Sequence, residues 1–229
     1  MGGLVPAGRG LFHIQIMSLD KYRYIVVEGP IGVGKTTLAQ RIADSIGAQT
    51  MLEQPQENPF LERFYRDAAH YALPAQMFFL FQRMEQLRKL TQTDMFNAPV
   101  VSDFLLDKDP IFATLTLADD ELKLYQQLYE HVRPQAPVPD LVIYLQAPAE
   151  ILVERVRKRG VSMEAGISSA YLHRLCESYS RFFYHYDGAP LLIVNNERLN
   201  PLERQEDFDL LMSRIASMRG KREFFNLGE

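Results

Sequence analysis

The sequence predicts an α/β fold in which helices flank both faces of a parallel sheet. Short runs rich in β-branched residues recur along the chain, and segments with apolar residues at helical spacing separate them. Strands that alternate with helices in this way favour a parallel sheet within a three-layer structure. A length of 229 residues fits one large domain of this kind better than two ordinary ones.

Individual elements can be placed along this pattern. Strands are predicted over residues 24–28, 99–104, 140–146 and 191–195, and another strand is expected to end just before Glu53. Helices are predicted over residues 36–46, 121–132, 149–159, 170–186 and 201–219. Residues 58–90 indicate one or two long helices, and Pro74 predicts a kink or break because proline cannot donate the helical hydrogen bond.

The predicted organisation is a single domain over residues 18–219. Residues 1–17 are expected to form a flexible extension, or to precede a true start at Met17. Residues 220–229 are expected to form a loosely held C-terminal tail.

Composition limits the classes of binding partner and the cellular compartment that can be expected for this protein. A formal charge of −4, from 25 basic and 29 acidic residues, argues against a polynucleotide partner. The longest apolar runs are too short to span a bilayer, so no membrane partner is expected. The lone cysteine, Cys176, cannot form an internal disulfide, which favours a reducing cytoplasm.

A glycine-rich turn connects the first predicted strand to the first predicted helix. It satisfies the pattern G-x-x-x-x-G-K-[ST], whose backbone amides surround phosphate groups at a helix N-terminus. Lys35 is expected to reach the terminal phosphates of ATP, and the Thr36 hydroxyl is expected to bind Mg²⁺. The predicted phosphate site comprises Gly29, Pro30, Ile31, Gly32, Val33, Gly34, Lys35, Thr36 and Thr37. The motif predicts a nucleotide site without naming the acceptor, since switches, ATPases and small-molecule kinases share it.

Two acidic residues are candidates for chemistry beside this loop. Glu53 is expected at a strand end, where a carboxylate could remove a hydroxyl proton beside the γ-phosphate. An ordinary exposed loop glutamate is an equally compatible interpretation. Asp103 follows the apolar residues 99–102, where an acid opposite Thr36 would assist Mg²⁺, although it could instead cap the following helix.

Two helical segments carry polar residues at suggestive spacing. Gln76 and Arg83 are seven positions apart, which brings them to nearly the same helix face, and a glutamine amide suits recognition of a heterocycle. Two solvated polar residues are the alternative. Arg155, Arg157 and Arg159 occupy a helix that runs into Gly160, where arginines could close over ATP as a lid or could simply be solvated.

Five segments in a fixed order carry a resemblance to a known family. They are EGPIGVGKTT, EQPQENPFLERFY, AQMFFLFQR, SDFLLDKDPIFA and YLQAPAEILVERVRKRG. With them the chain resembles the deoxynucleoside kinases over residues 24–196, especially the bacterial deoxyadenosine and deoxyguanosine kinase branch. The resemblance implies a P-loop NTPase fold with an arginine-bearing lid, ATP-dependent phosphorylation of a deoxyribonucleoside 5′-hydroxyl in nucleotide salvage, and a homodimer. The apolar helices of residues 60–90 would suit the dimer interface.

The resemblance also assigns roles to individual residues. Glu53 matches the general base, and Asp103 matches a carboxylate at the magnesium position. Tyr65 and Glu164 match the pair that holds the sugar 3′-hydroxyl. Gln76 and Arg83 match residues that bind the nucleobase, and Asp109 matches the acid that supports Arg83. Arg155 and Arg159 match the lid arginines. Because both Arg83 and Asp109 are retained, deoxyadenosine, deoxyguanosine or deoxycytidine is expected as the substrate rather than thymidine, with purines first.

The match departs from the family at three positions. Phe104 and Val161 stand where relatives often have arginine, and Gln54 replaces a commonly apolar or proline residue. Phe104 and Val161 motivate one alternative, a non-catalytic nucleotide-binding module. The other alternative, a nucleoside monophosphate kinase of the thymidylate type, would need a basic site for the acceptor phosphate near Glu53, and the sequence indicates none there.

Overall fold

The computed structural model describes residues 19, 21–92, 98–161, 164 and 166–226. The predicted extension of residues 1–17 therefore lies outside the described residues. Within the described residues, one parallel sheet has the strand order β2-β3-β1-β4-β5-β6. Its strands are β1 Tyr24–Glu28, β2 Gln49–Met51, β3 Val100–Ser102, β4 Leu141–Gln146, β5 Leu191–Asn195 and β6 Arg222–Phe225. The predicted parallel sheet is confirmed.

The C-terminal edge of the sheet differs from the sequence prediction. A loosely held tail was expected over residues 220–229, but Arg222–Phe225 forms β6 and pairs in parallel with β5. The preceding chain is held in place as well, because Glu223 accepts hydrogen bonds from the amides of Arg219 and Gly220. The prediction was wrong here because a short edge strand gains its stability from its neighbour rather than from its own composition.

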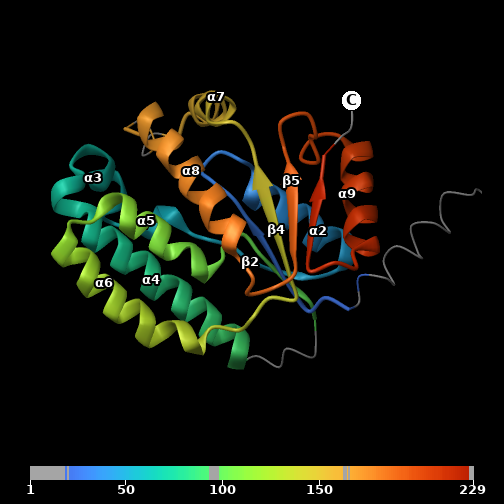
Figure 1. The fold of residues 1–229 in the computed structure, drawn as a ribbon, viewed down its shortest axis with the longest axis horizontal. Coiled ribbons are helices and arrows are strands. Elements are labelled where there is room, and N and C mark those ends of the chain that lie inside the picture. Colours follow the sequence, from blue (N-terminus) through green and yellow to red (C-terminus); the bar gives the residue numbers. More distant parts are fainter. Residues whose placement is uncertain (1–18, 20, 93–97, 162–163, 165, 227–229) are drawn as a thin grey trace, which may run out of the picture.

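Helices cover both faces of the sheet (Figure 1), with α2 and α9 on one face and α4, α5, α6 and α8 on the other. The longer helices are α2 Lys35–Ile46, α4 Ala68–Gln92, α6 Asp119–Val132, α7 Ala149–Arg159, α8 Ser169–His185 and α9 Gln205–Ser217. Shorter ones are α3 Leu61–Arg66, α5 Asp109–Thr116, η1 Pro55–Glu57, η2 Leu106–Lys108 and η3 Arg133–Gln135. Among the described residues, no helix is both long and apolar enough to cross a membrane.

Successive side chains of the central strands point to opposite faces of the sheet and so form two hydrophobic cores. Ile25 and Val27 of β1 pack towards α2 and α9, whereas Tyr24 and Val26 pack towards the opposite helical layer. Both faces of β1 and β4 are buried, as a parallel sheet between two helical layers requires. The carboxyl ends of β1, β2 and β3 are thereby held in register at one edge of the sheet, where the candidate site lies.

The segment of residues 58–90 forms two helices, but they do not separate at Pro74. The chain leaves the helix at Asp67, between α3 and α4, and Pro74 lies inside α4. Pro74 follows the first turn and a half of α4, and the carbonyl that its missing N–H would have bonded belongs to the exposed His70. The helix therefore does not break at Pro74, and the alternative of a kink there stays a prediction. The sequence pattern also did not predict α5.

Candidate active site

The phosphate loop links β1 to α2 as the sequence predicted. A Cβ at Gly29 would lie 2.5 Å from the carbonyl oxygen of Leu145 on the neighbouring β4, so only glycine lets the loop leave the sheet so closely. Gly34 adopts a φ of +97° at the N-terminus of α2, a conformation that side chains disfavour. The loop thus has the shape in which backbone amides can surround an anion at a helix N-terminus.

Thr36 and Asp103 meet at the end of the phosphate loop. The Thr36 hydroxyl donates a 2.5 Å hydrogen bond to Oδ2 of Asp103, while Oδ1 accepts one of 2.7 Å from the Glu53 amide. Burial raises the pKa of Asp103, and the nearby Glu53 carboxylate raises it further. A hydroxyl and a carboxylate at this point match the donors that Mg²⁺ uses in phosphate-loop proteins. No cluster of three or more His, Cys, Asp or Glu side chains suited to a metal occurs among the described residues.

Glu53 is an enclosed carboxylate, so its interpretation as an ordinary exposed loop residue was wrong. Its side chain is 15% exposed, and its Oε1 accepts hydrogen bonds from Nε and Nη2 of Arg83. Lys108 Nζ lies 3.3 Å from the same oxygen. Burial by itself would raise the pKa of Glu53, but Arg83, Lys108 and Lys35 outweigh it and hold the pKa well below its usual range.

These contacts also bear on the expectation that no basic site for an acceptor phosphate lies near Glu53. Arg83 and Lys108 both lie near Glu53, although each is already paired with carboxylates. Arg83 Nη1 donates a 2.5 Å hydrogen bond to Asp109, and Lys108 Nζ lies 3.2 Å from Oε2 of Glu28. The sequence could not reveal Lys108 because it approaches Glu53 from a distant part of the chain.

Gln76 and Arg83 lie on one face of α4, as their spacing predicted. They are 5% and 4% exposed, which rules out two solvated surface residues. Asp109 is fully buried and also accepts a hydrogen bond of 3.4 Å from the Tyr125 hydroxyl. Two hydrogen-bonding side chains therefore face the same cavity from a single helix, and Arg83 is held there by Asp109.

Tyr65 and Glu164 come from distant segments and line the same cavity. Burial raises the pKa of Tyr65, and the nearby Tyr171 and Glu164 raise it further, so the hydroxyl stays protonated and can donate. Arg159 Nη2 donates to both carboxylate oxygens of Glu164. Gly166, two residues after Glu164, packs closely against α3. A Cβ at Gly166 would lie 2.8 Å from the Tyr65 carbonyl oxygen.

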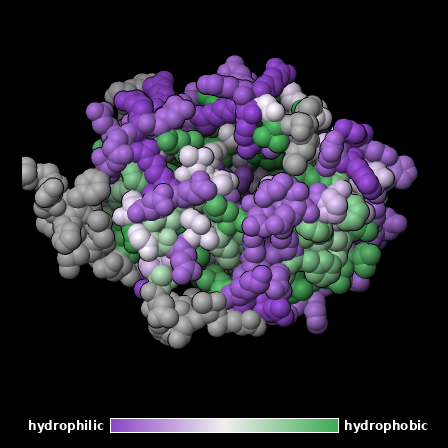
Figure 2. All heavy atoms as spheres, turned by 180° about the vertical axis from the view of Figure 1, so that it is seen from behind, coloured by the Kyte–Doolittle hydropathy of each residue, from purple (hydrophilic) through white to green (hydrophobic). Residues whose placement is uncertain are grey.

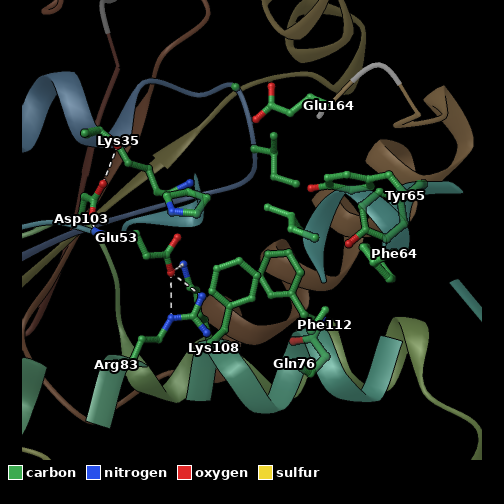
Figure 3. A pocket seen from close by; sticks show the side chains of 18 of the residues that line it. Lys35, Glu53, Phe64, Tyr65, Gln76, Arg83, Asp103, Lys108, Phe112 and Glu164 are labelled. Carbon is green, nitrogen blue, oxygen red and sulfur yellow. Dashed lines mark hydrogen bonds and ion pairs between the residues drawn. The ribbon is translucent and has the colours of Figure 1, made fainter. Parts of the chain in front are cut away.

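The candidate residues converge on one cavity of about 140 Å³. Figure 3 shows Lys35, Asp103 and Glu53 on one side of it, with Tyr65 and Glu164 across from them. The cavity is lined by Ile31, Gly32, Lys35, Thr36, Glu53, Pro55, Leu61, Phe64, Tyr65, Ala75, Gln76, Phe79, Arg83, Asp103, Lys108, Phe112, Arg159, Glu164 and Tyr171. The aromatic rings of Phe64, Phe79 and Phe112 were not predicted as site residues, because a helix pattern cannot distinguish them from core aromatics.

The three arginines of α7 have different surroundings. Arg159 lines the cavity and Arg157 is exposed. Arg155 Nη2 donates to the carbonyl oxygen of Asn196, while its buried Nη1 has no hydrogen-bond partner among the described residues. Asn196 in turn donates to the Val33 carbonyl of the phosphate loop, so Arg155 lies beside that loop rather than in the cavity.

The departures from the family pattern have structural consequences. Phe104 is fully buried in the apolar core, so this position contributes no cation to the cavity. Val161 lines a separate surface hollow with Val156 and Leu172 rather than the cavity. At Gln54 the main-chain carbonyl, which any residue would supply, accepts a hydrogen bond from the Gln82 side chain, so this contact with α4 does not depend on the glutamine.

Comparison with known proteins agrees with this geometry. The family model described as deoxynucleoside kinase matches residues 25–218. The chain is 34% identical over 200 residues to a deoxyguanosine kinase from Bacillus subtilis, with 85% of this chain and 97% of the relative covered. It is 30% identical over 190 residues to a deoxyadenosine kinase from Lactobacillus acidophilus, with 77% and 86% covered.

Solved structures show the same similarity. The structure of deoxyadenosine kinase from M. mycoides with products dCMP and a flexible dCDP bound superimposes with a TM-score of 0.75. Its sequence is 26% identical, and the match covers 85% of this chain and all of that one. The same kinase with bound dATP gives a TM-score of 0.74. The chain belongs to the deoxynucleoside kinase family.

Proposed function

We propose that this deoxynucleoside kinase transfers the γ-phosphoryl group of ATP to the 5′-hydroxyl of deoxyadenosine, deoxyguanosine or deoxycytidine, with purines first, in nucleotide salvage. The observation that carries the proposal is the position of Glu53. Its amide is bonded to Asp103 at the phosphate loop, and its carboxylate is bonded to Arg83 on the helix face that also carries Gln76. A hydroxyl held at Glu53 would therefore lie between the phosphate loop and the α4 face that carries Gln76 and Arg83.

In this proposal Glu53 orients the 5′-hydroxyl and accepts its proton. The low pKa of Glu53 makes it a weak base, but it keeps the carboxylate ionised at neutral pH. Phosphoryl transfer passes through a loose transition state, so positioning and charge stabilisation supply most of the catalysis. Lys35 and the lid residues Arg155 and Arg159 would stabilise the negative charge on the transferred group.

The residues at the phosphate loop fit a magnesium ion. Thr36 and Asp103 would hold it, because their hydroxyl and carboxylate oxygens already converge beside the loop. When bound, Mg²⁺ neutralises charge on the phosphate oxygens. Lys35, whose pKa is lowered by burial and by nearby Lys108, would gain a compensating anion when phosphate enters.

Tyr65 and Glu164 would bind the 3′-hydroxyl of the sugar, while Gln76 and Arg83 would bind the nucleobase. The cavity is small for such a ligand, since ligand sites usually occupy about 300–1,000 Å³ and this one occupies about 140 Å³. We infer that the contact between Arg159 and Glu164 opens on binding, which frees Glu164 for the sugar and Arg159 for the phosphates. Purines as the first choice agree with relatives named as deoxyguanosine kinase and deoxyadenosine kinase. A relative named deoxyadenosine/deoxycytidine kinase supports keeping deoxycytidine among the candidate substrates.

We further infer a cytoplasmic homodimer. Phe81 on α4 is 57% exposed and Leu124 on α6 is 49% exposed, and these two helices pack side by side. Figure 2 shows hydrophobic residues gathered on the flank that this helical layer occupies. Large apolar side chains on adjacent helices are suited to a symmetric interface.

The test is to incubate the purified protein with Mg-ATP and each common deoxyribonucleoside, ribonucleoside and deoxyribonucleoside monophosphate, and to resolve the products chromatographically. The Glu53→Gln variant is assayed beside Glu57→Gln, which makes the same chemical change at an exposed residue of the same loop. We expect deoxyribonucleoside monophosphates, purines first, and a loss of about 100-fold or more for Glu53→Gln only.

Two results would contradict the proposal at different points. Equal activity of Glu53→Gln and the wild type would remove Glu53 from the chemistry while leaving the kinase reaction intact. Phosphorylation of monophosphates in place of nucleosides would identify the thymidylate type of kinase instead.

A further inference from the structure

Lys108 is a buried cation with no part in the reaction described so far. It ends η2, immediately before α5, and only 1% of it is exposed. Its ammonium lies 5.8 Å from the centre of the Phe112 ring and among carboxylates at the floor of the cavity. Burying an ammonium is unfavourable unless it is paired, so its contacts define what it does.

Glu28 holds Lys108 in one place. Glu28 is the last residue of β1, directly before the phosphate loop, and is fully buried. Its Oε1 accepts hydrogen bonds from the Gly29 amide at 2.8 Å and from the Tyr179 hydroxyl at 3.0 Å. Its Oε2 accepts one of 2.8 Å from the Leu105 amide and lies 3.2 Å from Lys108 Nζ. With so many donors, the Glu28 carboxylate cannot turn, and it anchors the ammonium.

Lys108 and Arg83 approach the same oxygen of Glu53. Lys108 Nζ lies 3.3 Å from Oε1, and Arg83 Nε donates a hydrogen bond of 2.7 Å to that atom. None of the described residues donates a hydrogen bond to Oε2. The carboxylate therefore presents one bound oxygen and one available oxygen, and Figure 3 shows the bound oxygen directed towards the two cations.

The charges alternate through the floor of the cavity. Glu28, Lys108, Glu53, Arg83 and Asp109 form a chain in which each carboxylate contacts a cation. Arg83 has a further ligand in the proposed reaction, because it also faces the nucleobase. Lys108 has no such second ligand and keeps its anchor at β1 whichever nucleobase is bound.

We propose that Lys108 is a positioning residue for Glu53: anchored by Glu28, it holds Oε1 so that Oε2 faces the acceptor hydroxyl. This inference rests on the proposed role of Glu53 in the reaction. Lys108 also supplies a cation beside Glu53 in a chain that has Phe104 where relatives often carry arginine. Lys108 acts through Glu53 and is not itself required to touch the nucleoside.

The test is a double-mutant cycle on the full-length protein. Single-turnover rates, KM for the deoxynucleoside and ATP affinity are measured for Lys108→Met, Glu53→Gln and the combination, and Lys108→Arg serves as the conservative variant. Lys123→Met, at an exposed position of α6, is the matched control. Glu28→Gln combined with Lys108→Met removes both buried charges together, so a folded variant without the ammonium remains available if the single change unfolds.

We expect Lys108→Met to slow the chemical step about 100-fold, as misplacement of a reacting group does. KM for the nucleoside and ATP affinity should change little, and Lys108→Arg should restore part of the rate. In the Glu53→Gln background, Lys108→Met should have almost no further effect.

Three outcomes would overturn the inference. One is a full additional loss from Lys108→Met in the Glu53→Gln background, and another is an unchanged rate in a folded variant without the ammonium. The third is a rise in KM alone, which would place Lys108 in substrate binding. An unaffected Glu53→Gln enzyme would instead contradict the role of Glu53, and the inference about Lys108 would fall with it.

Discussion

Arg83 and Asp109 form an ion pair sealed inside the protein, with Nη1 of Arg83 2.5 Å from Oδ1 of Asp109. The two side chains are 5% and 0% exposed. Arg83 also holds the carboxylate of Glu53 through Nε and Nη2. The same guanidinium thus connects a core carboxylate with the residue proposed to meet the substrate hydroxyl.

Breaking this pair is expected to be strongly destabilising. Asp109→Ala leaves a buried guanidinium with one carboxylate fewer, which typically costs about 3–5 kcal/mol of unfolding free energy. Glu62→Ala is the control, because Glu62 pairs with Arg66 and the two side chains are 58% and 75% exposed, and exposed pairs contribute about 1 kcal/mol or less. Urea denaturation measures both, and similar losses for the two variants would contradict the prediction.

Glu164 is predicted to affect the nucleoside more than ATP. Glu164→Gln removes a charged hydrogen-bond acceptor from the proposed sugar site, which should raise KM for the deoxynucleoside about tenfold. ATP affinity should not fall, because Arg159 is released from its bond to Glu164. Steady-state kinetics with each substrate varied in turn provide the test, and Glu154→Gln, an exposed change on α7, is the control.

Gly29 is predicted to be essential for nucleotide binding. In Gly29→Ala, the new Cβ would lie 2.5 Å from the Leu145 carbonyl oxygen, so the phosphate loop must shift away from β4. Gly47→Ala is the comparison, because Gly47 has a φ of +65° but no atom within 4 Å of a new Cβ. Calorimetry should show lost ATP binding for Gly29→Ala and unchanged binding for Gly47→Ala, which should lose only about 1–2 kcal/mol of stability.

Cys176 is predicted to be an unreactive thiol. Burial, together with the nearby Glu150 carboxylate, raises its pKa to about 11. A raised pKa lowers the thiolate fraction, which at pH 8 should be roughly one thousandth. Alkylation by iodoacetamide, followed by intact mass, should be slow at pH 8 and faster at higher pH. Rapid labelling of the folded protein at pH 8 would contradict this assignment.

The proposed dimer interface can be tested on α4 and α6. Phe81→Asp or Leu124→Asp places a charge on the exposed apolar face and should yield monomers in light scattering. Leu210→Asp is the control, because Leu210 is 48% exposed on α9, which covers the opposite face of the sheet. A monomeric wild type at micromolar concentration would refute the dimer itself.

Local sequence signals determined much of the fold. The bounds of β1, β5 and α7 agree with the residues predicted from β-branched runs, helical spacing and Gly160. The phosphate loop and the shared face of Gln76 and Arg83 could also be predicted, because glycine geometry and helical periodicity act over a few residues. Interactions between residues a few positions apart in the sequence are sufficient to specify features of this kind.

Tertiary structure decided the features that depend on distant segments. The strand β6 forms only against β5, and the helix at Pro74 continues because the lost hydrogen bond falls near its exposed beginning. The contact between Lys108 and Glu28 joins residues 80 positions apart. Lys108 looks like a surface charge in the sequence, and only folding shows that buried carboxylates surround it. The free energy of a buried charge depends on which partners the fold brings within hydrogen-bond distance, and a linear sequence does not specify those partners.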